Sequence, residues 1–400
     1  MGTAPSVSPL CISVWCRTDQ SAWLAETLRT LAQSLSTQIA LGLVGCPEPG
    51  RAAQLGEELA RDGGAFILPP SAPCTDDLRA ALATAPPGLF ILADIGNVLA
   101  AEAQRPTADA ELLKEAAASG VRIVCLSPLP ASLTELATLA SVTVAGPGAP
   151  AVVSADASPG LDGASLLRSG SLAVFHPPVR CARHFADLRD VLEQFGPVRA
   201  ASVTCLSGPA DGGLGARLFE ALDLVGVLQG EPATIDAMWS GRGVRDIKGA
   251  RGLAERDGPP PEALRNLTGE ISANLRFADG RAAAVLVGDQ AGSRWWQIIA
   301  VGPGGRLVVD EHRLEWIDPA GRTVDRASAG RAAGHSRNGH RTAPAMWLAE
   351  LLRHLHAGVL PPALQGVNWP SVLATAQAAL LSCRTSAPES PATMLSLAAR

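Results

Sequence analysis

The sequence of 400 residues contains no tyrosine, and aromatic residues make up only 4% of it. Without tyrosine, no phenol hydroxyl can serve as a catalytic acid, whatever the reaction. The eight cysteines are scattered along the chain, and none has the CxxC spacing of a zinc or redox motif. This distribution argues against a disulfide framework. It is typical of buried thiols in a reducing cytoplasm, which is the location we expect.

An excess of positive charge and long apolar runs are also missing. The formal net charge is −5, so the chain lacks the basic surface that a nucleic-acid partner requires. No apolar run approaches the length of a membrane span, and the first residues lack the charged and apolar regions of a signal peptide. With 47% hydrophobic and 18% charged residues, the composition indicates a globular protein with a sizeable core.

Residues 10–150 alternate short apolar runs with helical patterns. The expected strands cover residues 10–15, 39–45, 65–68, 88–93, 121–126 and 142–145, and the expected helices cover residues 21–34, 49–62, 109–119 and 132–139. Strands joined by helices predict parallel pairing with right-handed crossovers, which makes a Rossmann-like, doubly wound sheet. Such sheets bind ligands beyond the carboxyl ends of their strands.

Residues 151–340 form a second expected domain, of a different class. A helix over 216–229 carries apolar residues at helical spacing, with one face expected to be buried. Two alternating runs, 270–277 and 282–288, flank Asp279-Gly280, which is a strong hairpin signal. Further strand-like runs lie at 295–301, 306–310 and 312–317. We therefore expect an α+β domain, a mostly antiparallel open sheet with helices on one face.

The segments outside the two cores are marked by their composition. Residues 147–170 are rich in glycine, proline, alanine and serine, and we expect them to cross between the domains. Residues 341–386 contain two final helices, expected to pack back on the N-terminal domain. Beyond Ser386 we expect a frayed tail.

The open face of the predicted sheet requires a partner. In Trp295-Trp296, alternation along a strand sends one ring toward the helices and the other onto the open face. Large exposed apolar side chains usually mark contacts between proteins. We therefore expect a homo- or hetero-oligomer that forms through this face.

The order of these elements resembles the glucose-fructose oxidoreductase and inositol dehydrogenase family, Gfo/Idh/MocA, over nearly the whole chain. The segment PEPGRAAQLGEELA is similar to the acidic turn and helix that follow the second strand of that family. GPVRAASV and LDLVGVLQGEP resemble a strand and a helix end of its second domain, and NWPSVLATAQAALLSC resembles its last helix. The resemblance implies a Rossmann-like domain, an open-sheet domain, and NAD(P) as the cofactor if one binds.

The family binds its dinucleotide through a GxGxxG loop, because glycine lets the backbone reach the pyrophosphate. By resemblance, the cofactor-binding positions here are Cys16, Arg17, Thr18, Ser21 and Cys46. Three of these side chains replace glycines and enter the space that a pyrophosphate would occupy. Asp19 adds a negative charge that Arg17 could offset, and either Asp19 or Ser21 could instead cap the following helix.

Cys46 replaces the acidic residue that holds the ribose hydroxyls in the family. Glu48, two residues further on, could reach the ribose instead, or it could be a solvated turn residue.

The catalytic positions have changed as well. The family's HxxD motif corresponds to Glu220 and Asp223, which a spacing of three places on one helix face, about 5–6 Å apart at Cβ. A close carboxylate pair raises one pKa and could act as a general acid and base, whereas most helical carboxylates are simply solvated. The lysine of the family's Glu-Lys-Pro motif corresponds to Ser127, which cannot supply a cation.

Three functions remain compatible with this sequence. The first is an oxidoreductase homologue without ordinary NAD(P) hydride transfer, with a binding, regulatory or assembly role. The second is an active NAD(P)-dependent oxidoreductase acting on a sugar or cyclitol-like hydroxyl with altered cofactor binding. The third is a cofactor-free lyase or epimerase that uses Glu220 and Asp223.

Overall fold

The computed structural model describes residues 9–61, 66–67, 72–93, 119, 121–128, 130–137, 174–175, 177–241, 264–265, 267–328, 339–357 and 366–398. The chain divides into two compact units. Unit 1 comprises Met1–Ser127, Ser165–His176 and Arg337–Pro362, and unit 2 comprises Pro128–Ala164, Pro177–Ser336 and Ala363–Arg400. Among the described residues, no helix is both long enough and apolar enough to cross a membrane.

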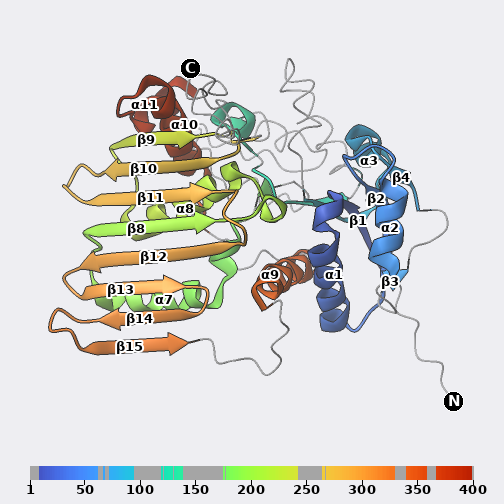
Figure 1. Cartoon of the computed structure of the whole chain (residues 1–400), viewed down its shortest axis with the longest axis horizontal. Coiled ribbons are helices and arrows are strands. Elements are labelled where there is room, and N and C mark those ends of the chain that lie inside the picture. The colour runs from blue at the N-terminus through green and yellow to red at the C-terminus, as the bar shows by residue number, and fades with distance from the viewer. Residues whose placement is uncertain are drawn as a thin grey trace, which may run out of the picture. The chain divides into compact units, whose positions relative to one another are not determined.

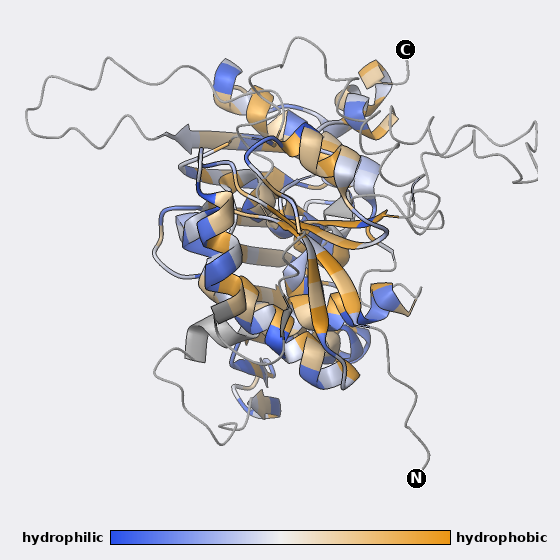
Figure 2. Cartoon of the chain, turned by 90° about the vertical axis from the view of Figure 1, so that its right-hand side faces the viewer, coloured by the Kyte–Doolittle hydropathy of each residue, from blue (hydrophilic) through white to orange (hydrophobic). Residues whose placement is uncertain are grey.

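Unit 1 is built on a parallel sheet. Its strands run in the order β3-β2-β1-β5-β6-β7, with β4 also paired to β2, and Figure 1 labels β1 to β4. They are β1 (Leu10–Trp15), β2 (Ile39–Gly45), β3 (Phe66–Ile67), β4 (Cys74–Thr75), β5 (Gly88–Leu92), β6 (Val121–Cys125) and β7 (Val174–Phe175). Consecutive residues of β5 are buried from Leu89 to Leu92, so side chains on both faces of the sheet avoid solvent. A strand buried on both faces is continuously apolar, which appears as orange in Figure 2.

Four helices are assigned to the described part of unit 1. They are α1 (Ser21–Leu35), α2 (Ala52–Arg61), α3 (Leu78–Thr84) and α9 (Gly339–His356). Helix α1 buries Leu24, Leu28 and Leu31, which share one stripe, and it packs against α9. The Arg122 Nη1 donates to the carbonyls of Leu355 at 2.6 Å and His356 at 3.1 Å. These bonds satisfy two acceptors that the end of α9 leaves open.

The expected strands and helices of this region are recovered where the chain is described, with exceptions among the short elements. Strands β4 and β7 and helix α3, each of seven residues or fewer, were not predicted from the sequence. Residues 133–137 are helical, inside the expected range 132–139. The expected strand at 142–145, and all of the expected helix at 109–119 except Ser119, lie outside the described residues.

Unit 2 contains the mostly antiparallel sheet that the sequence predicts. Its strand order is β15-β14-β13-β12-β8-β11-β10-β9. The strands are β8 (Ala200–Leu206), β9 (Thr234–Ser240), β10 (Glu270–Arg276), β11 (Ala282–Gly288), β12 (Trp295–Gly302), β13 (Gly305–Asp310), β14 (Arg313–Ile317) and β15 (Thr323–Ser328). Strands β8 and β11 pair in parallel, and the other neighbours pair antiparallel. The predicted hairpin is confirmed, since β10 and β11 pair directly across Asp279-Gly280.

Besides residues 133–137, the described part of unit 2 contains the helices α7 (Arg183–Phe195), α8 (Leu214–Gln229), α10 (Trp369–Thr385) and α11 (Pro391–Ala398), with short 3-10 turns η3 (Pro178–Cys181) and η4 (Pro209–Asp211). Helix α8 contacts β8 and β11 on one side and α10 on another. Phe219 of α8 and Trp369 of α10 have ring centroids 4.6 Å apart. Helix α8 is therefore buried nearly all round, and the prediction of a single buried face was wrong because α10 covers it.

The end of the chain differs from expectation in two ways. Helix α9 belongs to unit 1, whereas α10 belongs to unit 2, so the two final helices are divided between the units. The expected frayed tail is also wrong, because residues beyond Ser386 form α11, which packs against α10. Residue Glu389 additionally exchanges backbone hydrogen bonds with Ile235 of β9.

Candidate functional site

The loop between β1 and α1 holds most of the predicted cofactor positions. Strand β1 ends at Trp15, Cys16 is fully buried, and a 3-10 turn, η1 (Thr18–Gln20), leads into α1 at Ser21. The Arg17 N–H donates to the Gln20 side-chain oxygen at 3.0 Å, and the Gln20 N–H donates to the Arg17 carbonyl at 3.1 Å. Gln20 therefore closes the turn. Neither Asp19 nor Ser21 is the N-cap of α1, since Gln20 occupies that position.

Several other polar groups of the loop have partners within unit 1. The Cys16 N–H donates to the carbonyl of Gly45 at 3.1 Å. The Arg17 guanidinium pairs with the Asp19 carboxylate at 3.0 Å, and the Ser21 hydroxyl donates to the carbonyl of Thr18 at 2.8 Å. The Arg17 guanidinium is thus paired with a carboxylate two residues along the same loop.

Glu48 provides the main contact between this loop and the end of β2. Its Oε2 accepts the Thr18 hydroxyl at 2.6 Å and the Thr18 N–H at 3.3 Å, and the Cys46 thiol lies 3.7 Å away. From the sequence alone, Glu48 could be either a ribose ligand or a solvated turn residue. The structure instead turns its carboxylate inward, onto the start of η1.

An open pocket of about 460 Å³ adjoins this contact. Its lining residues are Thr18, Glu48, Pro49, Arg51, Gln54 and Glu58. Arg51 donates to Gln54 at 2.5 Å, and Gln54 donates to Glu58 at 2.9 Å, so a chain of hydrogen bonds runs along the pocket side of α2.

The thiols of the two cysteines at the predicted cofactor positions are unreactive. Burial raises the pKa of the Cys16 thiol far above its ordinary value, and the pKa of Cys46 is raised by burial as well. Both side chains are therefore protonated at neutral pH and are poor nucleophiles.

The predicted acid pair on α8 is brought together with three arginines. Glu220 and Asp223 are both buried. Glu220 Oε1 accepts from the N–H of Val179 at 3.2 Å and from Arg294 Nη2 at 2.8 Å. Arg217 Nη1 lies 2.7 Å from Glu220 Oε2, an ion pair that lacks hydrogen-bond alignment. Glu220 is therefore enclosed by two guanidinium groups.

Asp223 pairs with a different arginine from those that face Glu220. Arg180, which precedes α7, donates from Nε to Asp223 Oδ2 at 2.6 Å and from Nη2 to Oδ1 at 2.8 Å. Burial raises the pKa of the Asp223 carboxyl, although the two-pronged bond to Arg180 opposes the shift. The two carboxylates thus face separate guanidinium groups.

Three arginines of this cluster were missed or misjudged from the sequence. Arg180 and His184 lie around the start of a helix, where arginine and histidine side chains are usually exposed, but their exposed fractions are only 5% and 2%. Arg217 stands one helical turn before Glu220, a spacing that could have revealed the pair. Arg294 lies 74 residues from Glu220 in the sequence, so no local signal indicates it.

Ser127 lies just after β6, and its carbonyl accepts a hydrogen bond from the Cys125 thiol at 2.9 Å. It belongs to unit 1, whereas Glu220 and Asp223 belong to unit 2. Within the described ranges, no group of three or more histidine, cysteine, aspartate or glutamate side chains could hold a metal ion.

Solved structures of oxidoreductases share this fold. A levoglucosan dehydrogenase in complex with NADH and levoglucosan is 14% identical, with a TM-score of 0.62 over 96% of this chain and 99% of that one. An oxidoreductase from Agrobacterium radiobacter in complex with NAD+, L-tartaric acid and magnesium is 16% identical, with a TM-score of 0.60 over 97% and 100%. An oxidoreductase domain protein from Kribbella flavida is 14% identical, with a TM-score of 0.61 over 96% and 99%.

The chain therefore has the two-part fold of these oxidoreductases, and the predicted fold class and the resemblance in fold to Gfo/Idh/MocA proteins are confirmed. No protein-family model and no curated protein matches the sequence.

Proposed function

We propose that this protein is a divergent Gfo/Idh/MocA homologue that has lost ordinary NAD(P)-dependent hydride transfer and acts as a binding, regulatory or assembly subunit. The proposal is carried by one observation, the inward position of the Glu48 carboxylate on the loop that binds a pyrophosphate in dinucleotide-binding folds. Two further features, the paired carboxylates of α8 and the serine at position 127, point in the same direction.

Glu48 argues against a pyrophosphate on this loop for an electrostatic and a geometric reason. A phosphate at the start of a helix needs backbone N–H groups that point at it. The Thr18 N–H already points at Glu48 Oε2, and the N–H groups of Cys16, Arg17 and Gln20 have acceptors within the unit. A carboxylate in this place also repels the charge of a phosphate. The residues present therefore do not fit a dinucleotide in the usual position.

The carboxylates of α8 argue against proton transfer. A general acid or base must exchange a proton with the reacting group, so its oxygens must be within reach of it. Both oxygens of Asp223 bind Arg180, and Glu220 is fully buried between Arg217 and Arg294. Carboxylate oxygens that face guanidinium groups inside a buried network are not within reach of a reacting group. This weighs against the lyase or epimerase alternative as well as against a dehydrogenase.

Hydride transfer itself tests the proposal. The purified chain is incubated with NAD+ or NADP+ and a panel of polyols and sugars, and reduced nicotinamide is followed by its fluorescence. We expect no turnover that scales with the chain. Ser127→Ala, a small change at a half-buried position, is the matched variant. Turnover that co-purifies with the wild-type chain and falls in Ser127→Ala contradicts the proposal.

A further inference from the structure

Two buried arginines of unit 2 share a single carboxylate. Arg217, on the first turn of α8, and Arg294, just before β12, are only 2% and 9% exposed. Both pair with Glu220, Arg217 with one of its oxygens and Arg294 with the other. Among the described residues, neither arginine forms an ion pair with any other carboxylate. The neighbouring Arg180 and Asp223 form a separate pair, in which the charges balance.

The group formed by Arg217, Arg294 and Glu220 therefore carries one positive charge in excess. Burial lowers the pKa of the Arg217 guanidinium, Glu220 opposes this shift, and the charge of Arg294 adds to it. Asp211 also opposes the shift, but less than Glu220 does. The nearby Cys205 thiol stays neutral, because burial raises its pKa. Since buried charges in proteins are normally paired, the group has the charge that one monovalent anion would balance.

The start of α8 adds hydrogen-bond donors beside these charges. Helix side chains lean toward the N-terminus, and the Arg217 guanidinium lies against Gly212, where an added Cβ would be 3.5 Å from Nη2. The Nε of Arg217 is buried and donates to no described residue. The N–H groups of Gly212, Gly213 and Gly215 also have no acceptor in the described part of the chain. Free N–H groups at the start of a helix, together with the helix dipole, attract anions.

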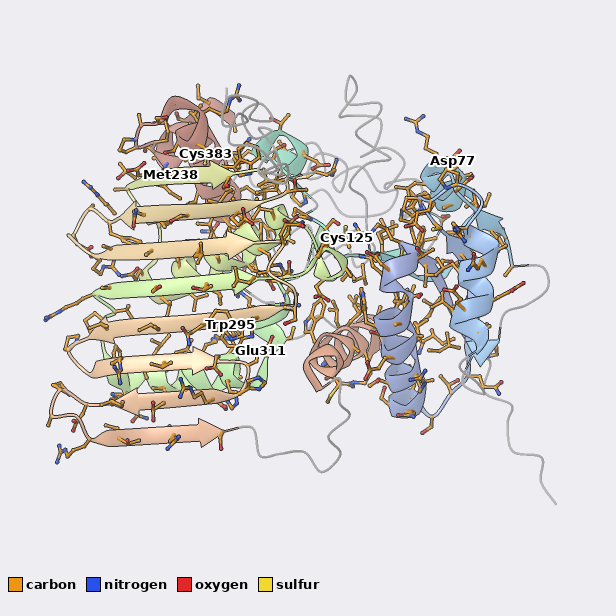
Figure 3. The ribbon with its side chains drawn as sticks, viewed as in Figure 1. Asp77, Cys125, Met238, Trp295, Glu311 and Cys383 are labelled. Atoms are coloured by element: carbon orange, nitrogen blue, oxygen red, sulfur yellow. The ribbon has the colours of Figure 1, made fainter. Side chains whose placement is uncertain are left out.

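Arg294 lies at the same end of the sheet as the loop that leads into α8. Trp295, which follows Arg294 and is labelled in Figure 3, pairs with Leu206 at the end of β8. The chain then enters α8 through a glycine-rich loop. Glycine lets this loop approach its neighbour closely, because a Cβ on Gly208 would lie 2.1 Å from the carbonyl oxygen of Gly292. Two guanidinium groups and the start of a helix thus meet at one end of the sheet.

We infer that the start of α8 binds a small organic acid through its carboxylate group, with Arg217, Arg294 and the free N–H groups of the first turn as donors. A carboxylate carries the single negative charge that balances the group, whereas a phosphate dianion exceeds it. Its two oxygens also match the planar fork of a guanidinium, which a spherical chloride ion does not. The inference rests on the proposed binding role and names the kind of ligand for it.

Thermal unfolding of the full chain in sodium acetate is the first test. Acetate is the probe for a carboxylate, and sodium chloride at the same ionic strength is the comparison. A ligand that binds the folded state raises Tm by an amount that follows its binding curve. We expect a saturable rise with acetate that exceeds any rise with chloride. Equal rises with the two salts, or no saturable rise with acetate, overturn the inference.

Arg294→Gln locates the effect in the protein. The substitution removes the excess charge, so the acetate-dependent rise in Tm is expected to disappear. Arg281→Gln is the matched control, because Arg281 forms an exposed pair with Asp279 at the opposite end of the sheet, and it is expected to keep the rise. A rise that survives in Arg294→Gln, or one that Arg281→Gln also abolishes, overturns the inference.

Glu220→Gln is expected to change the affinity in the other direction. It leaves Arg217 and Arg294 without their carboxylate, so acetate is expected to bind at least about tenfold more tightly than to the wild type, measured by isothermal titration calorimetry. A group that only stabilises the fold predicts no such gain, and unchanged or weaker binding overturns the inference. These tests involve no nicotinamide, so the inference can fail while the absence of hydride transfer stands, and the reverse is also possible.

Discussion

Glu220 and Asp223 show how far local spacing determines a site. The spacing of three residues correctly placed both carboxylates on one turn of α8, and the structure adds the cations that decide their chemistry. Arg180 and Arg294 come from segments 43 and 74 residues away, so tertiary packing alone brings them to the helix. Glu48 is a similar case, because its contact with Thr18 joins the ends of two strands across 30 residues. The sequence predicts candidates, and long-range partners determine their roles.

Glu220→Gln tests whether this carboxylate stabilises the structure. The substitution keeps the shape of the side chain but leaves Arg217 and Arg294 facing a neutral amide in a buried site. Breaking one partner of a buried ion pair costs about 3–5 kcal/mol, so we expect a loss of this order in the free energy of unfolding, measured by urea denaturation.

Glu350→Gln is the control for this substitution. Glu350 pairs with Arg353 on α9, but 54% of its side chain is exposed, and exposed pairs contribute little. We expect the midpoint of urea denaturation of Glu350→Gln to equal that of the wild type within error. If both glutamine variants shift the midpoint equally, the buried network is not a stabilising feature.

At the scale of elements, turn chemistry proved more informative than helix periodicity. Gly280 adopts φ 86° in the β10–β11 turn, which is the left-handed conformation that an Asp-Gly signal implies. The periodicity of α8 indicated one buried face but could not indicate that α10 covers the helix from another side. Short elements such as β4 and β9 were missed because they carry too few residues for a clear pattern, or mix polar and apolar positions.

Two glycine-to-alanine substitutions check these local conformations with opposite expected signs. Gly226 lies exposed in α8, and the space that an added methyl group would fill is open, so Gly226→Ala is expected to stabilise the fold by about 0.5–1 kcal/mol. Gly280→Ala also meets no neighbour, but its positive φ strains any other residue, so a loss of about 1–2 kcal/mol is expected. Thermal unfolding measures the change in stability of both variants. If the two changes had the same sign, the conformations assigned to Gly226 and Gly280 would be contradicted.

At the scale of the whole molecule, the sequence predicted the fold class, since alternating strand and helix patterns and a run of hairpins are each typical of one architecture. The limits of the units were harder to predict. Unit 1 is assembled from three separate segments of the chain. Helix α9 packs against α1, although the two helices are more than 300 residues apart in the sequence. No local composition signals such a return of the chain.

Titration of the wild-type chain with NADH and NADPH tests the central claim most directly. Binding is followed by quenching of tryptophan fluorescence and by the shift in Tm, because a ligand that binds the folded state stabilises it by RT ln(1 + [L]/Kd). The position of Glu48 predicts no saturable quenching and no Tm shift at millimolar dinucleotide. Saturable binding with a Kd at or below about 100 μM, accompanied by a rise in Tm, would contradict the account.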